Sequence, residues 1–478
     1  MDVAPPSVLL LDGDFDNTLV IARELTEDLD ATIIGAGTSP YSRLLHSTYC
    51  DVTCSLPPPG DPTYAAELLA LIEAHRPDVV LPVGYDSIAE LDAIRSDIPA
   101  AVSLCVPSSA SFGVAEDKAA TLECGSRLGL DTPREYSNIV EDLDADGRST
   151  SRLETLPFPL FCKARTENGT VTTAPVIEPD QFWETYDRIA AASPGNDVLV
   201  QEYVDDSRST YGCGLLFFEN EVVLLFSHEE LRSVPRWGGS GTHLRVLRDP
   251  HLEAASIRLL RDIGWHGVAL VEFKRRADGT YVLMEINPKF WASYALASRY
   301  GYRFASTLVA TTLELDIPHP IGSPAPVGEM AFPLRELQYH LEQREVATLG
   351  DTLRTVLTPG AAWDVDEQDL VAWLMPPVGL ANKLTVPDVG ELLSAATSMS
   401  PPSRNSEEYE EPRPERPHHT RTGRESNEYT RNGEPNDSTR YGKPNDGTGY
   451  GKSNDSMPYG ESNDGTRYGE SIEDGRYE

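Results

Sequence analysis

The sequence of 478 residues predicts a mixed α/β and α+β protein, and three features of the chain support that prediction. Short apolar runs alternate with helical patterns from about residue 7 to residue 107, which is typical of a parallel sheet. A strand-turn-strand pattern with alternating apolar and polar side chains occupies residues 267–293. Beyond residue 400 the chain contains no Val, Leu, Phe, Trp, Ala or Cys, so this part cannot form a core of its own.

Residues 1–107 are predicted to form a small domain around an open parallel sheet. Apolar runs such as SVLLL, ATIIG and VVLPV are separated by helical patterns such as TYAAELLALIEAH, and this alternation indicates repeated βα units. The turn after the first run, Asp12-Gly13-Asp14, lacks the GxGxxG pattern, and its acidic residues would repel a pyrophosphate. We therefore predict a nucleotide-fold-like domain without a dinucleotide site.

The segment GVALVEFKRRADGTYVLMEINPKFWAS, residues 267–293, is predicted to form a β-hairpin that sets two carboxylates face to face. Its Asp278-Gly279 dipeptide indicates a two-residue type I′ turn. Counting back from that turn along both strands places Glu272 opposite Glu285, with Asn287 on the same face. When one face of a strand pair is buried, the apolar residues on that face fix the register in which the two strands pair. The face predicted to be buried carries Val271, Phe273, Met284 and Ile286.

The two opposed carboxylates need a partner of opposite charge. Like charges directly opposite each other in an antiparallel pair are destabilising, with cross-strand effects of roughly 0.2–1 kcal/mol. Glu272, Glu285 and Asn287 together offer oxygen ligands, which suit Mg²⁺ or Mn²⁺, and Mg²⁺ commonly completes its shell with water and phosphate oxygens. The sequence therefore predicts a divalent cation at these three residues. The alternative interpretation is a solvated acidic hairpin.

This hairpin, with a first Glu followed by MEINPK, resembles the metal-binding end of the ATP-grasp superfamily, whose members include biotin carboxylase, the large subunit of carbamoyl phosphate synthetase and D-alanine ligases. The resemblance covers roughly residues 1–320. It implies ATP and Mg²⁺ (or Mn²⁺) as cofactors, and Glu272, Glu285 and Asn287 as the metal ligands. The family more often has Arg where this chain has Lys289, which keeps the charge but loses the bidentate fork.

The resemblance also implies a domain organisation. Residues 1–107 would be a pre-ATP-grasp domain that helps to form the substrate side of the cleft. Residues 108–320 would be the ATP-grasp domain, with two α+β lobes that close on the nucleotide. Residues 321–395 contain the helix-like run LRELQYHLEQREV and are predicted to be a small helical appendage. Residues 400–478, with Tyr-Gly pairs recurring every nine residues, are predicted to be a disordered low-complexity tail.

Two lysines match nucleotide-binding lysines of the superfamily in kind and order. Only seven of the 40 basic residues are Lys, so each lysine position is informative. Lys118 lies at a helix start in EDKAATLECGSRLGLDTP, and Lys163 ends the apolar strand FPLFCK. By the resemblance, Lys118 lies near the phosphates, and Lys163 reaches the α-phosphate and the adenine side; a compact ammonium group suits phosphate oxygens. The alternative is that both are surface lysines.

The strand VLVQEYV, residues 198–204, corresponds by the resemblance to the hinge between the lobes. In the family, one backbone N–H and one backbone C=O of the hinge contact the adenine edge. We assign Glu202 and Val204 to these backbone contacts and leave Gln201 as a polar neighbour. Alternation of apolar and aromatic residues alone predicts only a strand.

Two segments bear on how the phosphates are covered. The family has a glycine-rich lid after the second lysine, whereas ARTENGTVTT after Lys163 has a single glycine, so the predicted lid is short. A second glycine-rich segment, RWGGSGTHLR at residues 236–245, would close over substrate or the γ-phosphate, with Arg245 contacting a phosphate or acyl phosphate. The alternative is a surface loop. Arg245 and Lys289 are the candidate catalytic residues.

The reaction implied by the resemblance is attack of a substrate carboxylate on the γ-phosphate of ATP, followed by displacement of the acyl phosphate by an amine. Such an enzyme acts mainly by positioning and charge neutralisation, and the chain contains no GxSxG, HExxH or P-loop motif. The expected function is an ATP- and Mg²⁺-dependent carboxylate-amine ligase with small-molecule substrates. The alternative is a non-catalytic nucleotide-binding regulatory module that has lost the phosphate lid.

The charge balance bears on partners and environment. The chain holds 76 Asp plus Glu against 40 Lys plus Arg, which argues against nucleic acid and anionic membrane surfaces as partners. An acidic chain this poor in lysine resembles halophilic proteins, because a Debye length of about 3 Å in molar salt screens self-repulsion. The six cysteines are scattered, and we expect them to be reduced. Without a signal peptide or a long apolar run, we expect a cytoplasmic protein, with homo-oligomer formation left open.

Overall fold

The computed structural model describes residues 4–145, 147–148, 150–166, 172–195, 197–204, 209–316, 328–343, 350, 362–364 and 368–383. The chain divides into a unit of residues 1–400, to which all of these belong, and a unit of residues 401–478. The predicted tail and the core of the short loop after Lys163, residues 167–171, lie outside the described residues.

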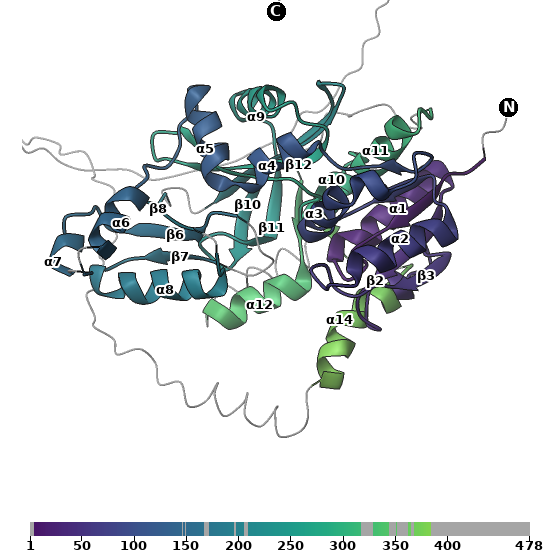
Figure 1. Ribbon diagram of the computed structural model, residues 1–478, viewed down its shortest axis with the longest axis horizontal. Helices are drawn as coiled ribbons and strands as arrows, with labels where there is room; N and C mark the ends of the chain where they lie inside the picture. The colour runs from purple at the N-terminus through teal and green to yellow at the C-terminus, as the bar shows by residue number, and fades with distance from the viewer. Residues whose placement is uncertain are drawn as a thin grey trace, which may run out of the picture. The chain divides into compact units, whose positions relative to one another are not determined.

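The N-terminal part is an open parallel sheet in the order β3-β2-β1-β4-β5 (Figure 1). Its strands are β1 (Ser7–Leu10), β2 (Thr32–Gly37), β3 (Val52–Ser55), β4 (Val79–Leu81) and β5 (Ser103–Leu104). Its helices are α1 (Asp16–Leu29), α2 (Tyr64–His75) and α3 (Tyr85–Ala93), with 3₁₀ turns η1 (Leu44–His46) and η2 (Arg95–Asp97). Both faces of β1 are buried, since Leu10 packs on the α1 side and Leu9 on the α2 and α3 side. The predicted parallel sheet is confirmed.

A seven-stranded sheet in the order β13-β12-β9-β10-β11-β14-β15 follows. Its strands are β9 (Thr210–Phe218), β10 (Glu221–Val234), β11 (Ser240–Leu247), β12 (Gly267–Arg275), β13 (Tyr281–Asn287), β14 (Glu329–Ala331) and β15 (Ala362–Trp363). The helices beside it are α4 (Ser109–Glu116), α5 (Lys118–Arg127), α9 (Pro250–Asp262), α10 (Tyr294–Arg299) and α11 (Phe304–Thr312). Neighbouring strands from β13 to β14 are antiparallel.

The segment predicted as a small helical appendage, residues 321–395, also contributes strands. It contains α12 (Pro333–Gln343) and α14 (Leu370–Lys383), but β14 also pairs with β11, and β15 pairs in parallel with β14. The strands are short and their partners lie far away in sequence, so no local pattern marks them. Residues from this segment therefore complete the edge of the large sheet.

The third sheet is a small antiparallel one in the order β7-β6-β8. Its strands are β6 (Leu160–Ala164), β7 (Thr173–Val176) and β8 (Val198–Glu202), with helices α6 (Ser137–Ala145), α7 (Thr150–Leu153) and α8 (Phe182–Ala192) and the 3₁₀ turn η3 (Pro179–Gln181). Cys162 and Val200 pack with Phe182 in the core under these helices. Together the parallel and antiparallel sheets confirm the mixed α/β and α+β fold.

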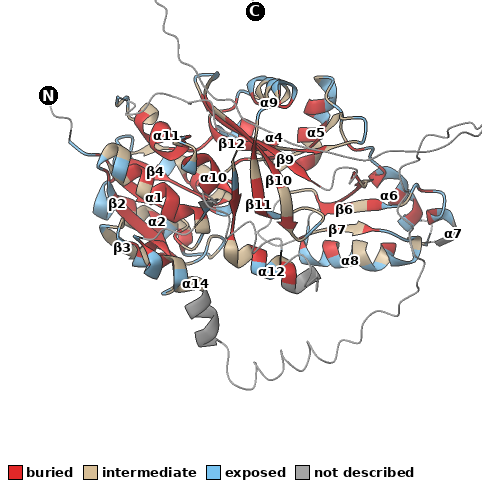
Figure 2. Ribbon diagram, turned by 180° about the vertical axis from the view of Figure 1, so that it is seen from behind, coloured by how far each residue is buried: buried red, intermediate tan, exposed pale blue. Residues whose placement is uncertain are grey.

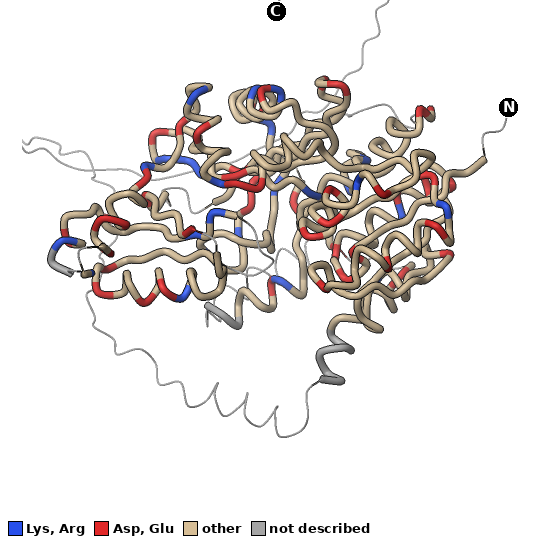
Figure 3. The backbone as a smooth tube through the Cα atoms, in the orientation of Figure 1, with Lys and Arg blue, Asp and Glu red and all other residues tan. Residues whose placement is uncertain are grey.

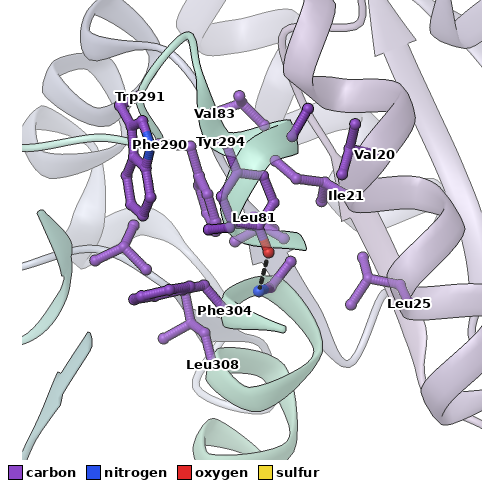
Figure 4. Close-up of a cluster of buried hydrophobic side chains, with 14 of the residues drawn as sticks. Val20, Ile21, Leu25, Leu81, Val83, Phe290, Trp291, Tyr294, Phe304 and Leu308 are labelled. Atoms are coloured by element: carbon purple, nitrogen blue, oxygen red, sulfur yellow. Dashed lines mark hydrogen bonds between the residues drawn. The ribbon is translucent and has the colours of Figure 1, made fainter. Parts of the chain in front are cut away.

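The N-terminal sheet and the large sheet share one buried core (Figures 2 and 4). It joins α1 and β4 to α10, α11 and the segment just after β13 through Val20, Ile21, Leu25, Leu81, Val83, Phe290, Trp291, Tyr294, Phe304 and Leu308. Within it the Tyr294 hydroxyl donates to Glu24 Oε2 at 2.6 Å. This packing fixes the N-terminal domain beside the end of the hairpin.

Three further observations concern partners and environment. No helix in the described ranges is both long and apolar enough to cross a membrane. Acidic and basic positions are interspersed along the described fold (Figure 3). All six cysteines are free thiols.

Candidate functional site

The hairpin brings the predicted metal ligands together. In the register of β12 and β13, Glu272 is the Cα partner of Glu285, as predicted. Asn287 lies two residues beyond Glu285, and its Nδ2 donates to Glu285 Oε1 at 3.5 Å. Two carboxylates and an amide are therefore gathered at the edge of the large sheet.

The turn that produces this register is not the predicted one. The Arg276 N–H donates to the Thr280 carbonyl at 2.9 Å, and the Gly279 N–H donates back to the Arg276 carbonyl at 2.9 Å. The loop thus has three residues, 277–279, and ends on Gly279 with φ of 93°. The prediction of a two-residue type I′ turn was wrong, because a type I turn followed by a left-handed glycine also fits this sequence.

A β-bulge restores the register that the longer loop would have shifted. Glu272 pairs with Glu285, but the next residue, Phe273, pairs with Leu283, so β13 carries one extra residue at Met284. Leu283 is fully buried in the core, and Met284 is only partly buried. The prediction that Met284 faces the core was therefore wrong. The extra residue turns the Met284 carbonyl toward β6, where it accepts a hydrogen bond from Lys163 Nζ at 3.1 Å.

The two carboxylates ionise unequally. Burial raises the pKa of Glu272 well above its usual range, and the nearby charges of Glu285 and Glu230 raise it further. Burial also opposes ionisation of Glu285, but Lys118, Lys163 and a hydrogen bond with Glu272 outweigh it and lower the pKa of Glu285. Glu272 therefore keeps its proton to a higher pH than Glu285 does.

The two predicted lysines lie against this pair. The Lys118 side chain is 8% exposed, and its Nζ lies 3.9 Å from Glu285 Oε2. Lys163 is 2% exposed. Burial lowers the pKa of Lys163 to about 8, although Glu285 favours the charged form. Two ammonium groups are thus enclosed next to the carboxylates.

The N-terminus of α5 fixes the position of Lys118 relative to β6. Asp117 caps the helix by accepting hydrogen bonds from the N–H groups of Ala119 and Ala120 at 2.9 and 3.2 Å. The same carboxylate forms an ion pair with Arg165, just after β6, at 2.8 Å. The Lys118 N–H donates to the Arg165 carbonyl at 2.9 Å. These contacts hold the start of α5 beside the end of β6, although the two segments lie far apart in sequence. Both lysines therefore lie at the hairpin.

A side chain of the predicted hinge forms an ion pair with the hairpin. Glu202 forms a bidentate ion pair with Arg276 at 2.5 and 3.0 Å. The Glu202 N–H donates to the Arg134 carbonyl at 2.8 Å. Of the two backbone groups of Glu202, the carbonyl is therefore the candidate contact to a base. Val204 follows β8 and is 4% exposed.

Lys289 lines a small pocket next to the metal ligands. The pocket wall includes Lys118, Glu285 and Asn287 from the site. Tyr85 at the start of α3 lines it from the N-terminal domain. Side chains of both domains therefore meet where the hairpin ends.

Arg245 is not brought to this site. Arg245 pairs with Glu229 across β10 and β11, and this row of Cα partners continues to Tyr211 and Phe273. Phe273 and Tyr211 lie in the core on the face of the sheet opposite Glu272. Arg245 instead forms an ion pair with Glu229 at 2.5 Å. A glycine-rich loop pattern did not reveal that residues from Ser240 onward form a strand.

Sequence reasoning missed Lys274. This residue is 6% exposed, two positions after Glu272 on the same strand, and its charge lowers the pKa of Glu272. Two signals could have found it, namely the scarcity of lysine and its period-2 spacing from Glu272. Four of the seven lysines of the chain thus lie at or beside the hairpin: Lys118, Lys163, Lys274 and Lys289.

No protein-family model matches the chain. The large chain of carbamoyl phosphate synthase from Campylobacter jejuni is 24% identical over 327 residues, which are 63% of this chain and 28% of that protein. D-alanine–D-alanine ligase from Cupriavidus taiwanensis is 27% identical over 186 residues, which are 36% of this chain and 54% of that ligase. The chain thus spans between about a quarter and a half of the length of these curated relatives.

Two solved structures share the fold. Biotin carboxylase from Campylobacter jejuni in complex with β-γ-ATP superposes with a TM-score of 0.54 at 12% identity, over 68% of this chain and 74% of that chain. The biotin carboxylase domain of the 2-oxoglutarate carboxylase from Hydrogenobacter thermophilus, in complex with MgADP, ADP and bicarbonate, gives a TM-score of 0.54 at 14% identity, over 68% and 73%.

The fold, the paired carboxylates of the hairpin and these similarities define one class of protein. A parallel-sheet domain followed by a small and a large antiparallel sheet is shared with biotin carboxylase, and both curated sequence relatives come from the superfamily that the hairpin resembles. In sequence and in fold the chain is similar to members of the ATP-grasp superfamily.

Proposed function

We propose that this chain is an ATP- and Mg²⁺-dependent ligase that activates a small carboxylate as an acyl phosphate for attack by an amine. One observation carries the proposal: four charged side chains from four elements lie close together, and both lysines among them are buried, namely Glu272, Glu285, Lys118 and Lys163. The sequence similarity to D-alanine–D-alanine ligase supports the same type of reaction.

Lys118 and Lys163 supply the positive charge that a triphosphate requires. Both are nearly enclosed, so water and salt screen their interaction with phosphate oxygens only weakly. Lys163 comes from β6 and Lys118 from the start of α5, so phosphates bound between them would be held from two sides. Phosphoryl transfer depends mainly on such positioning and charge neutralisation.

The side chains of Glu272, Glu285 and Asn287 fit a divalent cation. The donor set is oxygen from two carboxylates and one amide, as Mg²⁺ or Mn²⁺ prefers, and the carboxylates already face each other. In the described part of the chain no group of three or more His, Cys, Asp or Glu could hold a metal, and the proposed site therefore combines two carboxylates with the amide of Asn287. A bound cation would neutralise charge on the phosphates.

The remaining parts of the substrate are assigned by position. The carboxylate substrate would enter the pocket between Lys289 and Tyr85, where the ammonium group can meet a carboxylate or an acyl phosphate. The adenine would lie at the hinge, against the Glu202 carbonyl and the Val204 N–H. Arg245 has no place in this arrangement, because it lies on the other face of the sheet.

Trapping the acyl phosphate tests the proposal without knowledge of the natural amine. The full chain is incubated with ATP, Mg²⁺, hydroxylamine and a panel of amino acids and other small carboxylates, at low salt and in molar KCl. We expect ADP release and hydroxamate formation with at least one carboxylate. Glu285→Gln should abolish both products, and Glu221→Gln, an exposed control with an 81% exposed side chain, should leave them unchanged. Binding of ATP without hydroxamate from any carboxylate would favour the regulatory module instead.

A further inference from the structure

Glu230 on β10 is a buried carboxylate to which the proposed function gives no role. The residue is 5% exposed. In the described part of the chain, its one ion-pair partner is His228, whose Nε2 lies 3.9 Å from Glu230 Oε1. A histidine is charged only when it is protonated, whereas buried carboxylates usually pair with a full positive charge. A carboxylate buried without Lys or Arg beside it therefore indicates a cation that binds there.

Two neighbouring carboxylates show the usual pairing. Glu229, one residue earlier on β10, forms an ion pair with Arg245. Glu336 on α12 is 1% exposed and accepts two hydrogen bonds from Arg232, at 3.1 and 2.8 Å. The chain thus supplies an arginine to each of these two buried carboxylates but not to Glu230.

His228 lies beside the proposed metal site. Its Cα partner on β9 is Gly212, which in turn is the partner of Glu272 on β12. A Cβ at Gly212 would lie 2.5 Å from Cε1 of the His228 ring, so the ring occupies space that the missing side chain leaves. Side chains alternate along a strand, so Glu230 is on the same face as His228. Both side chains therefore share the face of the sheet that carries the metal ligands.

The His228 ring also has unused hydrogen-bonding capacity. It is 1% exposed, and its Nδ1 has no hydrogen-bond partner among the residues that the structure describes. Its Nε2 lies 3.5 Å from Oγ of Ser293, a buried residue just after the hairpin. Buried polar atoms are nearly always hydrogen-bonded. The carboxylate, the ring and the hydroxyl thus form a buried polar group that can still accept hydrogen bonds.

Resting on the proposed function, we propose that Glu230, with His228 beside it, binds the amine substrate in its ammonium form. A primary ammonium group carries one positive charge and three donors, and the Glu230 carboxylate, the His228 ring and the Ser293 hydroxyl offer the matching charge and acceptors. A metal ion fits less well, because the described residues contain no cluster of three or more His, Cys, Asp or Glu that could hold one. The substrate class is therefore a primary alkyl amine that binds as a cation.

Competition with hydroxylamine tests this site. Hydroxylamine is mostly uncharged near neutral pH, whereas alkyl amines are cations, so an amine that occupies the site should reduce hydroxamate formation. The full chain is given ATP, Mg²⁺, hydroxylamine and the carboxylate that yields most hydroxamate, at low salt. The probes are methylamine, propylamine, ethanolamine and putrescine, each compared with the alcohol that has hydroxyl in place of the amino group. We expect saturable inhibition by at least one amine and none by its alcohol.

A variant that keeps the shape of Glu230 but removes its charge locates the site. In Glu230→Gln, the amine concentration that halves hydroxamate formation should rise at least tenfold, as expected for loss of a hydrogen bond to a charged group. Glu229→Gln is the matched control, because Glu229 is the adjacent residue on the opposite face of the sheet, and this concentration should stay as in the parent. Yields with and without amine are compared within each protein, so a change in overall activity does not alter the result.

The outcomes separate the amine site from the proposed function. A parent chain that forms hydroxamate but is inhibited by none of the amines, or equally by the matching alcohols, would overturn the amine site and leave the proposed function standing. That comparison requires no variant to fold. Equal half-inhibiting concentrations for the parent and Glu230→Gln would remove Glu230 from the site. A parent that forms no hydroxamate with any carboxylate would refute the proposed function, and the amine site with it.

Discussion

The Lys163 ammonium group donates a hydrogen bond to the Met284 carbonyl at 3.1 Å, and this contact links the small sheet to the hairpin of the large sheet. The carbonyl points to Lys163 because β13 bulges at Met284. The same bulge keeps Glu272 opposite Glu285. One extra residue in a strand thus sets both the lysine contact and the carboxylate pair.

Replacing Lys163 with Met should weaken binding of a non-hydrolysable ATP analogue by at least tenfold. A hydrogen bond to a charged group contributes about 1.5–3 kcal/mol, and about 1.4 kcal/mol corresponds to tenfold in affinity. Because Lys163 is 2% exposed, the loss should persist in molar KCl, where an exposed contact would be screened. Arg188→Met, at an exposed position of α8, should bind like the unaltered chain. Equal affinities of the Lys163 variant and the parent at high salt would remove Lys163 from the nucleotide site.

The binding contribution of Lys163 should also depend on pH. Its pKa is lowered to about 8 in the free protein, so the charged form is lost as the pH rises through that value. Affinity for the ATP analogue should therefore fall between about pH 7 and pH 9, and Lys163→Met should show a flatter profile over that range. Titrations in one salt and Mg²⁺ concentration measure this. Parallel profiles for the two proteins would contradict it.

Glu272→Gln should abolish ATP turnover while leaving the melting temperature without metal unchanged or higher. Burial and the charge of Glu285 make ionisation of Glu272 unfavourable. A neutral amide at this position should therefore not lower the stability of the metal-free protein. Added Mg²⁺ and ADP should raise the melting temperature of the parent but not of the variant. A melting temperature several degrees lower without metal would mean that the carboxylate is needed for the fold.

Glu24 should make the protein less stable as the pH rises. Burial raises the pKa of Glu24 to about 7 from the usual 4.5, against the hydrogen bond that the Tyr294 hydroxyl donates to it. Between these values the folded chain keeps a proton that the unfolded chain releases, so the free energy of unfolding falls with increasing pH. Glu24→Gln should be more stable than the parent by about 1–3 kcal/mol at pH 8 and equal to it near pH 4. Urea melts at both pH values measure this, with the exposed Glu27→Gln as control.

Gly214 should not tolerate a methyl group. A Cβ there would lie 2.3 Å from Cη2 of Trp291, which is 2% exposed in the shared core. Gly214→Ala should lower the free energy of unfolding by about 1–3 kcal/mol, the usual cost of overpacking. Gly113→Ala is the control, since nothing lies within 4 Å of its Cβ and the residue is in α4. Equal stability of the Gly214 variant and the parent would mean that the Trp291 ring can move away without cost.

Local patterns were enough for the parallel sheet and the pairing of the carboxylates. Period-2 alternation and a turn dipeptide are encoded within about twenty residues, so they predicted that Glu272 faces Glu285. The pairing was correct although the loop was predicted one residue too short, because the bulge offset that error. The scarcity of lysine made Lys118 and Lys163 stand out, and both lie at the site.

Tertiary structure alone decided the features that depend on contacts between distant segments. The bulge places Leu283 rather than Met284 in the core, because the strand is also held by packing against α5. Three successive strand pairings put Arg245 on the face opposite Glu272. In the sequence Gln201 is an ordinary strand residue, and only the structure shows that its side-chain amide is buried with no hydrogen-bond partner among the described residues. Side-chain direction and hydrogen-bond satisfaction are set by neighbours that no local stretch of sequence contains.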